Sequence, residues 1–132
     1  MVNGKVNGQI GPGLLVLLAV QPADNPATVT RMADRVLGYR VFADERERMN
    51  LSLLQLGLAL LVVPQFTLAA DTQKGMRASF TSAAPPDMGR EYFDRFVAEC
   101  RSRLDKVETG VFAADMRVSL VNEGPVTFWL EA

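Results

Sequence analysis

The chain has 132 residues, of which 48% are hydrophobic and 22% charged, and its formal net charge is −1. These values predict one globular domain, residues 1–132, and exclude recognition of nucleic acid through bulk charge alone. The chain has no histidine and a single cysteine, Cys100. This composition excludes Ser-His-Asp and Cys-His catalysis, histidine metal sites and an internal disulfide.

The first predicted elements are strands. Asn3-Gly4 is typical of a tight hairpin turn, and residues 5–10 form the expected returning strand. Only two residues precede the turn, so we expect the first strand of the hairpin to be missing. Residues 14–20 are continuously apolar, which predicts a buried central strand, and the run is too short to span a bilayer. With no targeting segment and one cysteine, a cytoplasmic protein is expected.

A helix is predicted next. Asp24 or Asn25 can cap a helix that has Pro26 in its first turn, and Gly38 fits the position just past its end. Its apolar stripe consists of Val29, Met32, Ala33, Val36 and Leu37.

The following segments alternate between strand and turn patterns. Residues 39–42 predict a strand and residues 43–50 a charged turn, whereas residues 51–56 show only a weak strand-like alternation. Residues 58–63 predict a second buried strand. Because proline cannot donate to a β-ladder, Pro64 should lie at a strand end, an edge or a bulge.

The last third of the chain begins after a long polar connection at residues 72–86. Pro86 opens the clearest helix, whose apolar face carries Cys100. Cys100 is expected to be a buried core residue, and a reactive thiol is the alternative. Three more strands are predicted at residues 109–113, 116–121 and 126–131. The elements together predict an α+β domain with a mostly antiparallel, barrel-like sheet and two main helices.

Two segments are candidates for chemistry. Gln65-Phe66-Thr67 follows a buried strand; Thr67 could be a nucleophile, but its hydroxyl needs a base, so a polar ligand or a plain strand-end residue is the alternative. Gly124-Pro125 fits an ordinary trans turn, while a cis bond would align two carbonyls able to hold an ammonium group. With no CxxC, P-loop or GxGxxG motif, neither a metal nor a cofactor is expected.

Seven segments in chain order resemble the D-aminoacyl-tRNA deacylases, also called D-tyrosyl-tRNA deacylases. The segments are residues 8–18, 35–42, 49–51, 65–71, 74–80, 110–116 and 122–127. The resemblance implies hydrolysis of the ester that links a D-amino acid or glycine to the 3′ end of tRNA, a chiral proofreading step in translation. It also implies a homodimer with active sites at the interface, whose partner is the tRNA acceptor end, without cofactor, membrane or DNA.

The resemblance also implies roles for individual residues. Backbone amides of Gln65, Phe66 and Thr67 are expected to stabilise the oxyanion, with the ribose 2′-hydroxyl assisting attack. The family's Gly-Pro bond is cis, and its carbonyls hold the substrate's ammonium group. The substrate-binding residues are expected to be Asn122, Gly124, Pro125 and Val126, and the tRNA-binding residues Lys74 and Arg77.

Two departures from the family pattern leave alternatives open. Pro64 stands where the family usually has serine, which bears on the strictness of D-specificity. The short N-terminus motivates a second function, a truncated and inactive member that dimerises or binds tRNA ends without turnover. A third possibility is a hydrolase that depends on Thr67 as nucleophile.

Overall fold

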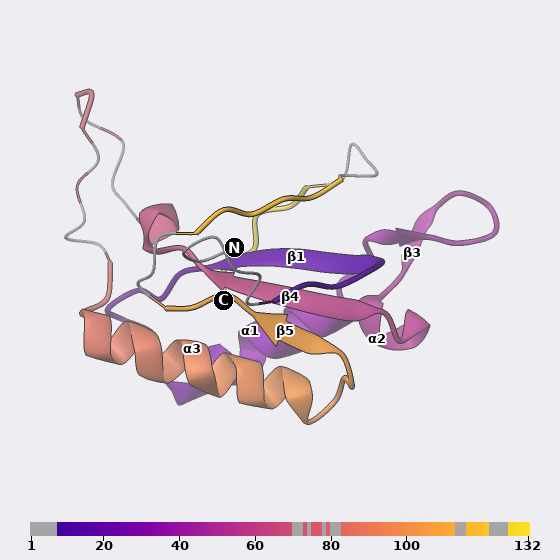
Figure 1. Ribbon diagram of the computed structural model, residues 1–132, viewed down its shortest axis with the longest axis horizontal. Helices are drawn as coiled ribbons and strands as arrows, with labels where there is room; N and C mark the ends of the chain where they lie inside the picture. Colours follow the sequence, from indigo (N-terminus) through magenta and orange to yellow (C-terminus); the bar gives the residue numbers. More distant parts are fainter. Residues whose placement is uncertain are drawn as a thin grey trace.

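The computed structural model describes residues 8–69, 73, 75–77, 79, 83–112, 116–121 and 127–132. Figure 1 shows a small sheet with helices α1 and α3 packed on one of its faces. The elements in chain order are β1 (Gly13–Leu18), α1 (Pro26–Gly38), β2 (Phe42–Ala43), β3 (Met49–Leu51), α2 (Leu53–Leu56), β4 (Ala59–Pro64), the 3-10 helix η1 (Phe66–Ala69), α3 (Pro86–Arg101) and β5 (Val107–Thr109).

The main sheet is parallel, with strand order β1-β4-β5. Leu60 of β4 lies opposite Leu14 of β1 and Val107 of β5. The mostly antiparallel, barrel-like sheet predicted from the sequence is therefore wrong. The described residues form an open parallel sheet and one short antiparallel pair, β2 with β3. The reason lies in the connections: α1 follows β1 and α3 follows β4, and a helical crossover returns the chain to a strand of the same direction.

Helix α1 begins as predicted, and Asn25 rather than Asp24 is its cap. The Asn25 side-chain oxygen accepts a hydrogen bond from the Thr28 amide at 3.0 Å, and the Asn25 amide donates to the Thr28 hydroxyl at 3.3 Å. These reciprocal bonds satisfy donors that the first turn of a helix leaves without partners. Gly38 is the last residue of the helix and Tyr39 its C-cap, one position later than expected.

The core lies between the sheet and the two long helices. Phe96 and Cys100 of α3 are 1% and 0% exposed, and the same cluster contains Leu37 of α1 and Leu60 of β4. Burial raises the pKa of the Cys100 thiol to about 12. The prediction of a buried core cysteine is confirmed, because a thiol so far from ionisation is a poor nucleophile at neutral pH.

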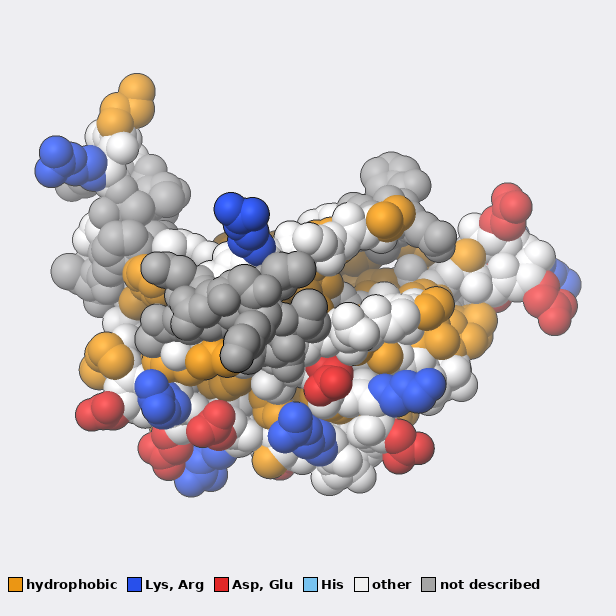
Figure 2. All heavy atoms as spheres, viewed as in Figure 1, with side chains coloured by type: hydrophobic (Ala, Val, Ile, Leu, Met, Phe, Trp, Pro, Cys, Tyr) orange, Lys and Arg blue, Asp and Glu red, His pale blue; other side chains and the backbone are white. Residues whose placement is uncertain are grey.

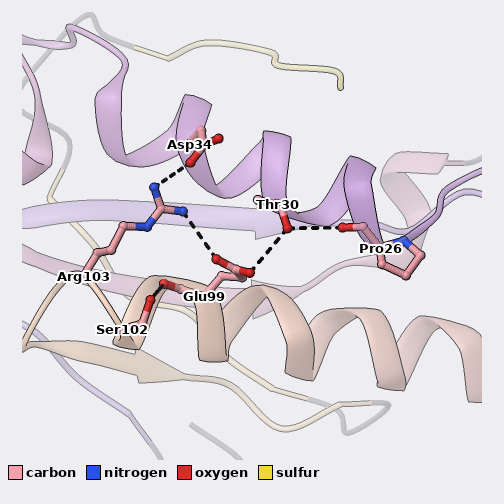
Figure 3. Close-up of polar contacts among 6 residues, drawn as sticks. All are labelled: Pro26, Thr30, Asp34, Glu99, Ser102 and Arg103. Atoms are coloured by element: carbon pink, nitrogen blue, oxygen red, sulfur yellow. Dashed lines mark hydrogen bonds and ion pairs between the residues drawn. The ribbon is translucent and has the colours of Figure 1, made fainter.

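Polar contacts join α1 and α3 at the surface (Figure 3). Arg103 pairs with Asp34 at 2.5 Å and with Glu99 at 3.6 Å. The Thr30 hydroxyl is 3.3 Å from Glu99 Oε1. Surface ion pairs contribute roughly 0.2–1 kcal/mol each, so the buried apolar faces stabilise this helix pair more than these contacts do.

Several local predictions differ from the structure. Residues 53–56 form α2 instead of continuing a strand, because Ser52 caps this turn reciprocally with Gln55 and Gly57 ends it at a φ of 63°. The strand predicted at 39–42 is shortened to β2, which begins only at Phe42 and ends one residue later than predicted, at Ala43.

The predicted C-terminal strands are also reduced. β5 ends at Thr109, where a strand was expected to begin. Neither the strand predicted at 116–121 nor the described part of the one predicted at 126–131 forms, and only Met116 makes an isolated bridge. Most of these side chains are exposed, and the backbone joins no described ladder. Of the strand expected at residues 5–10, residues 8–10 are not a strand and the others lie outside the described residues.

Candidate functional site

The predicted catalytic segment lies at the carboxyl end of the parallel sheet. The Gln65 amide donates to the Leu18 carbonyl at 2.7 Å, which extends the pairing of β4 with β1 by one residue. Pro64 ends β4, as its missing N–H predicts. In open α/β sheets, ligands bind outside the carboxyl ends of the strands, so this edge is where a site is expected.

Residues 65–67 pass directly from the strand into η1. The first bond of this turn runs from the Leu68 amide to the Gln65 carbonyl at 3.2 Å, and the amides of Phe66 and Thr67 precede it. The Phe66 side chain is 61% exposed, and that of Thr67 is also exposed. The chain thus presents main-chain and side-chain groups together at the end of the sheet.

The Thr67 hydroxyl contacts the Gln65 side chain. Gln65 Nε2 donates to Thr67 Oγ1 at 2.9 Å. A carboxamide NH₂ has no basic lone pair to take the hydroxyl proton, so this contact orients Thr67 without activating it as a nucleophile.

Gly110 lies close to the end of β4 and to Met116. The Gly110 amide donates to the Val62 carbonyl at 2.9 Å. A Cβ on Gly110 would lie 3.0 Å from Met116 Sδ and 3.5 Å from Pro64 Cδ. The chain that leaves β5 is therefore held against the end of β4, next to the candidate catalytic segment.

The other predicted site residues are only partly described. Arg77 is exposed, in the segment that projects away from the sheet beside η1 in Figure 1. Lys74 lies outside the described residues, as do the expected substrate-binding residues Asn122, Gly124, Pro125 and Val126.

A contact that the sequence analysis missed fixes the chain after residue 126. The rings of Tyr39 and Phe128 lie 5.5 Å apart between centroids, and the Arg35 guanidinium lies 5.9 Å from the Tyr39 ring. Arg35 Nη1 also donates to the Glu131 carbonyl at 2.5 Å. An aromatic residue directly after a helix, with an arginine one turn earlier, was the signal available in the sequence.

Two surface grooves of the described part of the chain lie away from the predicted site. A groove of about 520 Å³ follows α3 beside Thr109, and one of about 320 Å³ lies between α1 and α3. Neither is lined by a predicted site residue. In the described part of the chain, no three His, Cys, Asp or Glu side chains are grouped as a metal site would need, and no helix there is long and apolar enough to cross a membrane.

The sequence model of D-Tyr-tRNA(Tyr) deacylase matches residues 1–131. The chain belongs to this family. It is similar to the D-aminoacyl-tRNA deacylases of Yersinia pestis and Yersinia pseudotuberculosis, each 57% identical over 131 residues, which cover 99% of this chain and 90% of the relative. The family predicted from the sequence is thus confirmed.

Two solved structures are similar to the deacylase chain. One is named c-Myc DNA Unwinding Element Binding Protein; it superposes with a TM-score of 0.94 at 32% identity, over 100% of this chain and 90% of its own. The other is described as a probable eukaryotic D-amino acid tRNA deacylase, with a TM-score of 0.80 at 19% identity, over 95% and 88%. The second match supports the predicted fold name.

Proposed function

We propose that the chain hydrolyses the ester between a D-amino acid, or glycine mischarged on tRNA(Ala), and the 3′-terminal ribose of tRNA. The observation that carries this proposal is 57% identity to D-aminoacyl-tRNA deacylases over nearly the whole chain. The predicted deacylase function and hydrolase class are confirmed by that similarity and by the family match. The substrates named here, and a role in chiral proofreading during translation, go further.

The chemistry rests on main-chain groups. Water attacks the ester carbonyl carbon, and the ribose 2′-hydroxyl assists this attack. The bond to the ribose 3′-oxygen then breaks, and that oxygen takes up the proton that the attacking water releases. Amides of residues 65–67 stabilise the negative oxygen of the intermediate; one such donor is worth roughly 2.7–4 kcal/mol in known enzymes. The place of this segment at the carboxyl end of β4 supports the assignment.

Residues 122–126 bind the amino acid. Carbonyls of Gly124 and Pro125 accept hydrogen bonds from the substrate ammonium group, with Asn122 and Val126 completing the pocket. A D side chain points away from this backbone, whereas an L side chain meets it, so selectivity comes from steric rejection.

Two cationic side chains of the proposed site contact the tRNA backbone. Lys74 and Arg77 belong to the connection that follows η1, and Arg77 is exposed. Phosphate contacts by lysine and arginine weaken as salt rises. The partner is the tRNA acceptor end in the cytoplasm, without a membrane, a cofactor or DNA.

The enzyme acts as a homodimer with its active sites at the interface. Exposed apolar side chains in the C-terminal stretches support this proposal. Val121 is 90% exposed, Trp129 66% and Leu120 59%. Large exposed apolar surfaces on soluble proteins mark interaction sites.

The test is an assay with D-Tyr-tRNA and L-Tyr-tRNA in the presence of EDTA. We expect rapid release of D-tyrosine and only background release of L-tyrosine. Equal rates would defeat the D-specificity. If the protein binds tRNA but hydrolyses neither ester, the result would support the alternative of a truncated, inactive family member. The comparisons give no evidence for that alternative. A DNA duplex serves as the binding control, because one solved relative is named for DNA binding.

Thr67→Ala separates the main-chain mechanism from a nucleophilic threonine. The variant keeps the amide at position 67, so we expect kcat within about threefold of wild type. Thr67→Ser is the matched control, since it retains the hydroxyl. A loss of about 100-fold or more in the alanine variant alone would assign the hydroxyl as nucleophile.

A further inference from the structure

The end of β4 is fixed on both of its sides. β4 lies between β1 and β5 in the main sheet (Figure 1). On the β1 side, the Gln65 amide donates to the Leu18 carbonyl at 2.7 Å, and on the β5 side the Gly110 amide donates to the Val62 carbonyl at 2.9 Å. Gln65 directly follows β4 and Gly110 directly follows β5. The backbone pairing therefore continues up to the start of η1.

Two side chains meet over Gly110 at this edge of the sheet. A Cβ on Gly110 would lie 3.0 Å from Met116 Sδ, 3.3 Å from Met116 Cε and 3.5 Å from Pro64 Cδ. The thioether and the proline ring thus converge on the space that the missing Cβ leaves. Met116 and Pro64 are both partly buried, and neither belongs to the core cluster. Pro64, Gly110 and Met116 form a separate small group, called here the Pro64 cluster.

The Pro64 cluster lies directly before the proposed catalytic segment. Pro64 is the last residue of β4, and η1 begins at Phe66. The proline ring holds its own φ at about −65°, which restricts the direction in which the chain leaves the strand. A displacement of this ring reaches the amides of residues 66 and 67 through a single intervening residue. Misplacement of a catalytic group by about 1 Å can cost on the order of 100-fold in rate.

We propose that Pro64 and Met116 are positioning residues for ester hydrolysis. Met116 lies over Gly110 beside the Pro64 ring and so fixes the direction in which residues 65–67 leave β4. The amides of this segment then meet the developing oxyanion without rearrangement, as electrostatic stabilisation of a transition state requires. This inference rests on the proposed function. It gives a role to the Met116 side chain and to the proline that stands in place of the family's usual serine.

Three variants disturb or preserve the Pro64 cluster, and two serve as matched controls. Met116→Ala removes the thioether, whereas Met116→Leu replaces it with an apolar side chain of similar volume. Pro64→Gly removes the ring and its restraint on φ. Met49→Ala is the methionine control, because Met49 is 54% exposed on β3 of the two-stranded sheet. Pro12→Ala is the proline control, since the Pro12 carbonyl accepts from the Ala59 amide at the opposite end of β4.

The first measurement is steady-state hydrolysis of D-Tyr-tRNA. For Met116→Ala and Pro64→Gly we expect kcat about tenfold lower with KM within about twofold of wild type, because the amides act on the transition state more than on the bound ester. Met116→Leu should keep kcat within about threefold. The double variant should lose about 10- to 30-fold rather than about 100-fold, since both side chains act through one contact. Met49→Ala and Pro12→Ala should match wild type.

The second measurement does not depend on activity. Hydrogen exchange of the Gln65 amide reports on the strand end, because this amide is bonded to the Leu18 carbonyl. We expect exchange to be about tenfold faster in Met116→Ala and unchanged in Met49→Ala. Circular dichroism checks that each variant is folded. If Pro64→Gly does not fold, the comparison of the two Met116 variants decides the question.

The outcomes distinguish the positioning role from the proposed function. Wild-type kcat in folded Met116→Ala, a change in KM alone, or unchanged exchange of the Gln65 amide would overturn the positioning role and leave the proposed function intact. An equal loss of kcat in Met49→Ala would overturn it too, because the effect would then not depend on the Pro64 cluster. A wild-type protein that hydrolyses neither ester would overturn the proposed function and the positioning role with it.

Discussion

The helix layer and the C-terminal stretches at residues 116–121 and 127–132 are held in place by different means. Caps, continuous apolar stripes and a shared core fix α1 and α3. The C-terminal stretches expose large apolar side chains and have only an isolated bridge among their described residues. Charged side chains of both signs cover the lower, helical part of Figure 2. The comparison teaches that caps and apolar packing fix the helix layer, whereas the C-terminal stretches leave large apolar side chains uncovered in a single chain.

The largest effect should come from breaking the helix layer. Phe96→Ala removes a side chain that is 1% exposed at the centre of the core, so we expect a loss of roughly 3–5 kcal/mol in the free energy of unfolding. Urea denaturation measures it. Arg95→Ala, next to it on α3 but in an exposed pair with Glu91, should cost no more than about 0.5 kcal/mol. Comparable losses would mean that α3 does not pack as described.

The next effect tests the opposite layer. Val121→Asp places a charge on a side chain that is 90% exposed in a single chain. If this stretch forms the dimer interface, dimerisation should weaken at least about 100-fold, because an unpaired charge is costly to bury. Sedimentation equilibrium measures it, with Ala98→Asp on exposed α3 as control. A Val121→Asp protein that remains fully dimeric would place the interface elsewhere.

A smaller effect tests how α1 begins. Asn25→Ala removes the cap oxygen that accepts from Thr28, and we expect a loss of about 1 kcal/mol in the free energy of unfolding. Asp24→Ala removes only a bond from the Gln21 amide outside the helix, so about 0.5 kcal/mol or less is expected. Thermal denaturation of both variants checks which residue is the cap. A larger loss of stability for Asp24→Ala than for Asn25→Ala would make Asp24 the cap.

The smallest effect concerns the turn between β2 and β3, which belongs to neither layer. Hydrogen bonds from the Arg48 and Arg46 amides hold the pKa of Asp44 below its ordinary value of 3.8. A lowered folded-state pKa stabilises the turn above pH 3.8, and this contribution is lost as the pH falls through the lowered value.

Amide chemical shifts of residues 46 and 48 should therefore titrate with a midpoint below 3.8. Asp44→Asn is the control and should show no such transition. A midpoint at or above the ordinary value would show that the amides do not favour the carboxylate.

The sequence predicted the elements that carry their own pattern. The helix with the predicted apolar stripe is α1, the helix expected to open at Pro86 is α3, and the predicted apolar run became β4. Strand direction was predicted wrongly, because alternation describes which side chains are buried and not which strand is the neighbour. The two crossover helices held that information.

The site was predictable in part for the same reason. Gln65, Phe66 and Thr67 are contiguous, so their place after β4 followed from the strand itself. Arg35 and Tyr39 contact the C-terminal stretch over a long sequence separation, since Arg35 and Glu131 are 96 positions apart. No local sequence pattern encodes such a pairing. Single-turn helix α2 was missed because four residues are too few for a period, although Ser52 and Gln55 form a capping box.

The central place of β4 has a consequence for synthesis on the ribosome. β4 pairs with β1, which precedes it, and with β5, which is completed only at Thr109. A nascent chain that has emerged only as far as Pro64 leaves one edge of β4 open, with a run of apolar residues exposed to other strands. Closing the sheet waits for α3 and its crossover, so a pause in translation before residue 109 should favour misassembly, and chaperone binding is expected to matter most in that interval.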